Sequence, residues 1–110
     1  MIIVHGGAGE WPTALHRSGL HGVKRAVDLG FKVLANGGSA LDAVETAIVS
    51  MEDNPVFNAG TGSSLNLVGE IETDAAIMDG KSLKGGGVAL LGDVKNPNKA
   101  ARVIMENLIT

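Results

Sequence analysis

The sequence has no cysteine and no tyrosine, and one tryptophan and two phenylalanines are its aromatic residues. The absence of cysteine excludes disulfides, thiolate zinc sites and a thiol nucleophile. We therefore expect a protein of the reducing cytoplasm. No apolar run approaches the about 18 residues of a membrane-spanning helix. No basic segment precedes an apolar stretch, so no signal peptide is predicted either.

Charge is also scarce and evenly distributed. Nine lysines and arginines stand against twelve acidic residues, for a net charge of −3. The basic residues form no stripe that would follow a phosphate backbone, so neither nucleic acid nor an anionic membrane is an expected partner. Hydrophobic residues make up 45% of the 110 residues and charged residues 19%. This balance is typical of a globular chain, and the length allows one domain at most.

Glycine is abundant, with sixteen glycines against three prolines. The glycines separate well-patterned apolar segments, so we expect tight turns and close backbone approaches rather than a flexible linker. The apolar residues 1–5 predict a buried strand that enters a glycine-rich turn at 6–9. This turn lacks the glycine spacing of a dinucleotide site and the Gly-Lys-Ser/Thr of a P-loop, so nucleotide binding is not favoured.

A period of three to four in the apolar residues predicts an amphipathic helix over 13–35. Leu20 and Phe31 are among the apolar positions assigned to its buried face, while most of its charged residues fall on the other side. The sequence Asn36-Gly37-Gly38 follows directly and is typical of a helix end.

The same period predicts two further helices. Ser39, with Asp42 three residues on, resembles a capping box for a helix that ends near residue 53, because Asn54 precedes a proline. The third helix begins at Pro97. Its predicted buried face comprises Ala100, Ala101, Val103, Ile104 and Leu108.

Between the second and third helices the period changes to two. Residues 65–67 and 71–77 alternate between apolar and polar side chains, with a reversal at 68–70, and predict two antiparallel strands. Asp79-Gly80 predicts a two-residue hairpin turn into a third strand that contains 88–91. The order of strand, two helices, three strands and a helix predicts an α+β fold, with an antiparallel sheet and covering helices.

Three histidines and three carboxylates are candidate chemical groups. His16 and His21 are five residues apart, so they do not share a helix face as a metal-binding pair would. His5 ends the predicted strand, and a structural role is favoured over that of a catalytic base. The carboxylates lie at alternate positions, Glu70, Glu72 and Asp74. Such a row can bind a cation or act as acid and base, but a solvated strand edge is the preferred interpretation.

The most informative segment is 52–62, where a helix ends and an irregular stretch with few long side chains follows. Carbonyl groups at a helix C-terminus lack helical partners, attract positive charge and suit a hard cation. The alternative is a loop ordered by hydrogen bonds from the side chains of Asn54 and Asn58 to its own backbone. The residues alone favour this alternative, which needs no ion.

Five blocks of sequence follow one another along the chain. They are VHGGAG at 4–9, GSALDAVE at 38–45, EDNPVFNAGTGS at 52–63, ETDAAIMDG at 72–80 and KNP at 95–97. In this order and at this spacing, the blocks resemble the plant-type asparaginase and isoaspartyl peptidase family. They cover nearly the whole chain.

The resemblance implies a fold and an activity. The family fold is an αββα sandwich of the N-terminal-nucleophile hydrolases, and its members remove the side-chain amide of asparagine or cleave isoaspartyl dipeptides. A precursor cuts itself, and a threonine becomes the first residue of a second subunit. The hydroxyl of that threonine attacks the substrate while its free amine takes the proton. The second subunit also carries the oxyanion groups and the residues that hold the substrate.

By this resemblance, residues 1–110 are the N-terminal portion of an incomplete asparaginase-type domain. No catalytic residue is expected in this chain, which lacks the nucleophilic threonine and should be inactive alone. The implied partner is a downstream subunit that carries the nucleophile, and the complete enzyme is expected to be a homo-oligomer of such heterodimers. No organic cofactor is implied.

The resemblance also assigns a metal site and a supporting residue. Asn58 matches an asparagine that supports the surroundings of the nucleophile. The family loop at this position wraps a structural sodium ion with main-chain carbonyl groups, which makes the cation the preferred interpretation of the segment. The matching carbonyl groups belong to Met51, Glu52, Asn54, Phe57, Ala59 and Thr61.

Two alternatives remain at this point. Residues 64–72 and 78–83 also resemble taspase, a threonine protease with the same fold, although 5–7 and 54–57 are closer to the asparaginase pattern. The second alternative is that the chain is a non-catalytic module, which binds a partner through an uncovered sheet face. The apolar residues expected on that face are Leu65, Leu67, Ile71, Ile77 or Val88.

Overall fold

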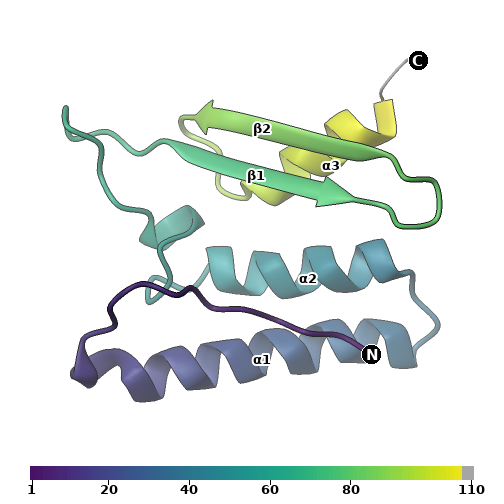
Figure 1. The fold of residues 1–110 in the computed structure, drawn as a ribbon, viewed down its shortest axis with the longest axis horizontal. Coiled ribbons are helices and arrows are strands. Elements are labelled where there is room, and N and C mark those ends of the chain that lie inside the picture. The colour runs from purple at the N-terminus through teal and green to yellow at the C-terminus, as the bar shows by residue number, and fades with distance from the viewer. Residues whose placement is uncertain (108–110) are drawn as a thin grey trace.

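The computed structural model describes residues 1–107. Two helices lie side by side, and a two-stranded antiparallel sheet with a third helix against it stands next to them (Figure 1). This mixed architecture confirms the α+β prediction. In chain order the elements are the 3-10 turn Thr13–Leu15, α1 (His16–Ala35), α2 (Ala40–Glu52), the 3-10 turn Gly60–Gly62, β1 (Thr73–Met78), β2 (Gly85–Leu91) and α3 (Pro97–Asn107). On the predicted buried face of the third helix, Ala101 is buried, but the prediction is wrong for Val103 and Ile104, which are 57% and 41% exposed, and Leu108 lies outside the described residues.

The buried face of α1 is made of small residues, Gly19, Gly22, Ala26 and Gly30. Gly30 lets α2 approach closely, since a methyl group there would lie 2.9 Å from the carbonyl oxygen of Ala43, while Gly19 and Gly22 make room for the rings of Trp11 and Phe57. The prediction that Leu20 and Phe31 lie on the buried face is therefore wrong, and these side chains are 74% and 56% exposed. Hydrophobicity alone pointed to the bulkiest residues, whereas α2 and the rings of Trp11 and Phe57 lie so close to this face of α1 that only small residues fit there.

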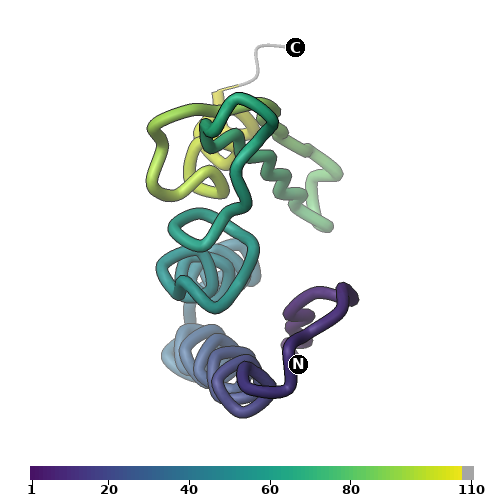
Figure 2. Tube along the Cα trace, turned by 90° about the vertical axis from the view of Figure 1, so that its left-hand side faces the viewer, coloured from purple at the N-terminus to yellow at the C-terminus, as the bar shows by residue number. Residues whose placement is uncertain are grey.

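The N-terminal segment is extended but does not form the predicted strand. Residues 1–7 belong to no strand, and within 1–107 no main-chain hydrogen bond joins residues 1–6 to another segment. Burial nevertheless alternates, because Ile2 and Val4 pack on the core of the helix pair while Ile3 points outward. Figure 2 shows this purple segment beside the helices. The segment has the side-chain pattern of a strand but lacks the neighbouring strand that would complete it.

The predicted three-stranded meander contains two strands. Leu65 and Ile71 form an isolated bridge around the predicted reversal, but 65–67 does not continue as a strand. The turn after β1 is longer than the predicted two-residue hairpin, because the Asp79 N–H donates to the Lys84 carbonyl at 2.8 Å. The Asp79 carboxylate accepts hydrogen bonds from Ser82 and Lys81, which hold its pKa below the ordinary value. This side chain thus orders the longer turn.

Helix α3 covers one face of the sheet. Ile77, Ala101 and Met105 are its buried core, and Val88 packs against them. The prediction that Ile77 and Val88 lie on the uncovered face is therefore wrong, since both face α3. Leu65 and Leu67 are exposed as predicted, and so is Ile71. No helix in the described part of the chain is both long and apolar enough to pass through a bilayer.

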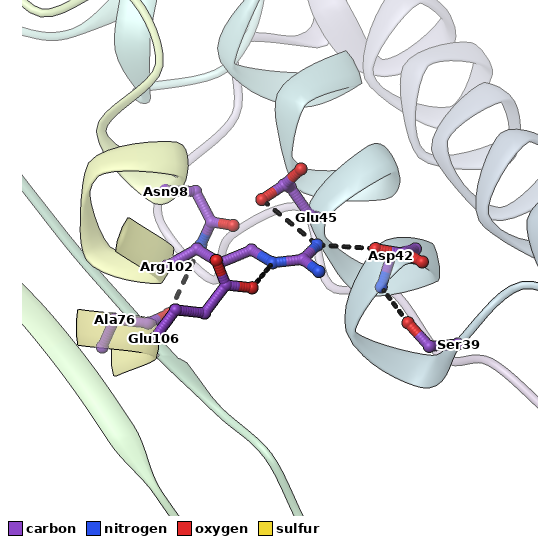
Figure 3. A network of polar contacts seen from close by, with 7 residues as sticks. All are labelled: Ser39, Asp42, Glu45, Ala76, Asn98, Arg102 and Glu106. Atoms are coloured by element: carbon purple, nitrogen blue, oxygen red, sulfur yellow. Dashed lines mark hydrogen bonds and ion pairs between the residues drawn. The ribbon is translucent and has the colours of Figure 1, made fainter. Parts of the chain in front are cut away.

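A polar cluster joins α2 to α3, with Arg102 at its centre (Figure 3). The guanidinium lies 2.8 Å from the Asp42 carboxylate, 3.5 Å from Glu45 and 2.8 Å from Glu106. The Asp42 N–H donates to the Ser39 hydroxyl at 3.0 Å, which confirms the predicted cap. The hydrogen bond from Arg102 is the main reason that the pKa of Asp42 is below its ordinary value, and Ser39 adds to it.

We expect Arg102→Met to change the acid sensitivity of the chain. The lowered pKa of Asp42 stabilises the folded state above about pH 3.8, the ordinary pKa of an aspartate, and this contribution disappears as the pH falls through the lowered pKa. The variant should be less stable than the parent at pH 7, and the difference should shrink below pH 4. Urea unfolding of the variant and the parent, at pH 7 and below pH 4, measures this difference in stability. Arg17→Met, on the exposed surface of α1, is the control, and a difference independent of pH would contradict the prediction.

Candidate functional site

The segment 53–62 is an ordered loop that leaves the C-terminus of α2. Its first turn is held by the Asn54 N–H, which donates to the Met51 carbonyl at 3.1 Å, and by the Phe57 N–H, which donates to the Asn54 carbonyl at 3.1 Å. The Val56 N–H donates to Asn54 Oδ1 at 3.1 Å. The predicted use of the Asn54 side chain to order the loop is confirmed.

Phe57 anchors the loop to the core. It is 3% exposed, and its ring meets the Trp11 ring edge to face at 5.8 Å between centroids. The ring also lies against Gly22 of α1, where a methyl group would come within 2.6 Å of it. The glycine in α1 and the phenylalanine in the loop therefore fit as a pair, and together they fix the position of the residues that follow.

Asn58 is exposed directly after this anchor. Its Oδ1 accepts a hydrogen bond from the Ser64 N–H at 2.8 Å, so the side chain orders the loop from its far end, as predicted. Asn58 lines two open pockets. One, of about 610 Å³, includes His5, Gly7 and Trp11. The other, of about 560 Å³, includes Glu72, Thr73 and Asn98.

The six carbonyl groups predicted to bind sodium differ in their hydrogen bonding. Those of Met51, Asn54 and Ala59 each accept a main-chain hydrogen bond within the loop. No hydrogen bond among residues 1–107 reaches the other three, which belong to Glu52, Phe57 and Thr61. A carbonyl oxygen has two lone pairs, so even the bonded groups retain one for a cation.

Two glycines make room for these carbonyl groups. A methyl group at Gly60, which has a φ of +53°, would lie 2.6 Å from the Glu52 carbonyl oxygen. At Gly62 it would collide with the Phe57 carbonyl and lie 2.6 Å from that of Pro55. The loop thus gathers main-chain oxygens around positions where only glycine fits. The Pro55 carbonyl was not predicted as a member of this set, because an irregular backbone does not reveal its carbonyl directions in sequence.

Glu52 has a second role that was not predicted from the sequence. Its carboxylate is buried and accepts hydrogen bonds from the Asn98 N–H and from Asn96 Nδ2, both at 3.0 Å. Burial raises the pKa of Glu52 above its ordinary value, although these two hydrogen bonds oppose the rise. A signal was present in the sequence, because an acid in the last turn of a helix opposes the helix dipole and needs a partner elsewhere.

The remaining candidates form no further site in the part of the chain that the structure describes. His5 reaches the pocket beside Asn58, and its Nδ1 accepts a hydrogen bond from the Gly7 N–H at 3.3 Å. Glu70 precedes β1, and Asp74 Oδ1 accepts a hydrogen bond from the Leu90 N–H at 2.8 Å. Within the described residues, no three His, Cys, Asp or Glu side chains gather in a way that would hold a metal ion.

Known proteins match the chain over nearly its whole length. The family model described as "Asparaginase" matches residues 1–109. A plant-type L-asparaginase of Pyrococcus horikoshii is 56% identical over 106 residues, which cover 96% of this chain and 34% of that protein. Proteins named isoaspartyl peptidase/L-asparaginase are 53% identical over 106 residues in Xenopus laevis, with the same coverage, and 48% identical over 107 residues in Homo sapiens, with 96% and 35% covered.

The chain spans about a third of the length of these relatives. The match extends across all the sequence blocks that contain the loop, the glycine turn and the start of α3. The identity is far above the level at which chance resemblance is a concern, and it is similar for the archaeal and the animal proteins. The chain belongs to the plant-type asparaginase and isoaspartyl peptidase family.

Proposed function

We propose that this chain supplies the N-terminal portion of an amidohydrolase that acts on the side-chain amide of asparagine or on isoaspartyl dipeptides. The relatives bear the names of these two activities. The observation that carries the proposal is the ordered loop that holds Asn58 at the border of two open pockets, in a chain that matches the family over 1–109.

The proposed nucleophile is a threonine of a second subunit, released by self-cleavage of a precursor. Its hydroxyl would attack the amide carbon while its own amine takes the proton. The threonines near Asn58 are not suited to this role. Thr73 is buried and its hydroxyl donates to the Leu91 carbonyl at 3.3 Å, and Thr61 lies within a 3-10 turn and has no free amine. Asn58 would support the surroundings of the incoming threonine.

Two features support a polypeptide partner that completes the αββα sandwich. The extended residues 1–6 have no main-chain partner within 1–107, so a further strand can pair with them. The face of the sheet opposite α3 is open, and Asp74, Ala76 and Met78 of β1 are exposed on it. A second sheet packed on this face would give the four layers. The assembly of such heterodimers into a larger homo-oligomer stays a prediction.

The proposal is tested by reconstitution. The 110-residue chain is produced alone and together with the remaining two thirds of the Pyrococcus horikoshii relative. We expect ammonia release from asparagine, or hydrolysis of an isoaspartyl dipeptide, from the pair and from neither chain alone. Asn58→Ala in the pair should reduce the rate by about 100-fold or more, as for other residues that support a reacting group. Ammonia release by the isolated 110-residue chain would refute the proposal.

We also propose that the loop holds a structural sodium ion. The carbonyl groups of Glu52, Phe57 and Thr61 would be its principal ligands, together with those of Met51, Asn54 and Ala59. The crowding of carbonyl oxygens around Gly60 and Gly62 supports this proposal, because neutral oxygens are ligands that hard cations prefer. The ion would fix the loop that carries Asn58 and would take no part in the reaction.

We expect sodium or potassium chloride to raise the melting temperature relative to choline chloride at equal ionic strength. An ion at a hundred times its Kd stabilises the folded state by about 2.7 kcal/mol. Gly62→Ala should abolish the difference between the salts, since its methyl group would displace the Phe57 and Pro55 carbonyl groups. Equal melting temperatures of the parent chain in all three salts would contradict the cation site.

A non-catalytic, partner-binding module is the second candidate function. The exposed side chains of Leu65, Leu67 and Ile71 favour it, because they leave large apolar groups in water in the segment that precedes β1. A monomeric chain with a sharp cooperative melt, and no activity with the complementary chain, would support this candidate. The taspase alternative and the cytoplasmic location stay predictions.

A further inference from the structure

Glu52 occupies a position that is unfavourable for an acid. It is the last residue of α2, where the helix dipole repels negative charge, and it is 3% exposed. A buried carboxylate is tolerated only when hydrogen bonds compensate the loss of water. The placement of this side chain therefore requires a specific set of partners.

The partners of the carboxylate come from the start of α3, more than forty residues along the chain. One oxygen accepts the Asn98 N–H at 3.0 Å, and the other accepts Asn96 Nδ2 at 3.0 Å. Asn96 directly precedes the helix, and the free N–H groups at its first turn favour negative charge. Glu52 thus caps a helix that is distant in sequence.

The backbone of Glu52 supports the loop at the same time. Gly60 packs directly on it, so that a methyl group there would lie 2.6 Å from the Glu52 carbonyl oxygen and 2.8 Å from its Cβ. The loop residue Asn58 lies two positions before this contact and is bonded to Ser64 beyond it. A movement of Glu52 would therefore move the turn on which Asn58 depends.

Asn98 extends the connection to the sheet. Its Nδ2 donates to the Ala76 carbonyl of β1 at 3.4 Å, and its Oδ1 is buried without a hydrogen-bond partner among residues 1–107. The position of Asn98 therefore depends on Ala76 and on Glu52. Glu52, Asn58 and Asn98 all line the pocket of about 560 Å³.

We propose that Glu52 is a positioning residue for the loop that carries Asn58. Its carboxylate joins this loop directly to the first turn of α3 and, through Asn98, to β1. This inference rests on the proposed function, since it concerns the same loop. Both partners of the carboxylate are donors. A glutamine keeps one acceptor oxygen for the Asn98 N–H but places an NH2 group opposite Asn96 Nδ2. A flip of the Asn96 amide would accept from that group, but it would break the hydrogen bond from Asn96 Nδ2 to the Asp53 carboxylate, at 3.0 Å, and turn an oxygen toward it.

The test compares Glu52→Gln with Glu45→Gln, a control that makes the same change on the same helix and loosens the contact with Arg102. Amide hydrogen exchange followed by NMR is the measurement. We expect Glu52→Gln to accelerate exchange at Ser64 and Asn98 by about tenfold relative to Ala26 in the core of α1. Glu45→Gln should leave the Ser64 rate, measured in the same way, unchanged.

Asn96→Ala is a second variant that leaves the buried carboxylate with its bond from Asn98, and it removes the hydrogen bonds that Asn96 Nδ2 donates to Glu52 and to Asp53. It should accelerate exchange at Ser64 in the same direction. Unchanged Ser64 exchange in Glu52→Gln or in Asn96→Ala, or equal acceleration in Glu45→Gln, would overturn the proposal. The measurement uses neither substrate nor second subunit, so its failure is separate from a failure of reconstitution.

Discussion

Replacing Gly86 by alanine should destabilise the chain more than the same replacement at any other glycine of the sheet. Gly86 lies in β2 where α3 crosses it, and its added methyl would collide with the Ala101 carbonyl and lie 2.6 Å from the Met105 nitrogen. These are backbone atoms within one helix, so relief requires the helix to move away from the sheet. We expect a loss of about 3 kcal/mol in the free energy of unfolding.

Gly87→Ala is the matched control for this experiment. The two glycines are neighbours on the same strand, but a methyl group at Gly87 points to the open face and meets the Ala75 carbonyl at 3.7 Å, an ordinary contact. The control should change stability little, whereas Gly86→Ala should lower the melting temperature by more than about 10 °C. Thermal unfolding followed by circular dichroism measures both, and equal melting temperatures would show that α3 does not pack on the sheet at this position.

Phe57→Ala should also be strongly destabilising, because it removes the anchor of the loop. A buried phenylalanine replaced by alanine costs about 3 to 5 kcal/mol, and here the ring also holds Trp11 and fills the space beside Gly22. The loss should extend beyond the core, since exchange at the Ser64 amide, which is bonded to Asn58, should accelerate as the loop loosens.

The second phenylalanine of the chain supplies the control. Phe31 is 56% exposed on α1, so Phe31→Ala should change the free energy of unfolding by well under about 1 kcal/mol. Chemical unfolding measures both variants. A similar loss for the two would mean that the loop is not anchored by Phe57, and it would remove the main support for the ordered site.

The helices could be predicted from the sequence because their signals are local. The spacing of apolar residues, the cap at Ser39 and the proline at 97 all act within a few residues, and each helix appears within a few residues of its predicted bounds. The predicted strand over 1–5 is wrong, because a strand needs hydrogen bonds from a distant segment, which a local pattern cannot supply. Its apolar alternation is present, but the pairing is not.

Burial was harder to predict than helix position. The buried face of α1 follows the glycines and Ala26, because α2, Trp11 and Phe57 pack so closely on it that small volume matters more than hydrophobicity. Ile77 faces α3 because the sheet has one helix against it, and a pattern of period two cannot say which face that helix takes.

The candidate site was predicted in part. The loop, Asn58 and its ordering hydrogen bond follow from the irregular segment after α2 and from the family resemblance. The cap that the Glu52 side chain provides for α3 joins residues that are distant in sequence, so the acid at the end of α2 indicates that a partner is needed, but no local pattern says which residue supplies it. Sequence thus located the segment, while the connection between its elements required the fold.

The lone extended segment at the N-terminus has a consequence for the production of this protein. Ile2, Ile3 and Val4 are adjacent, uncharged and rich in β propensity. Their amide and carbonyl groups have no main-chain partner within residues 1–107, so they can bind an identical segment of another molecule. Concentrated solutions of the chain should therefore form oligomers or fibrils with cross-β character. Synthesis together with a polypeptide that covers this edge would prevent such assembly, and yield would then depend on the ratio of the two chains.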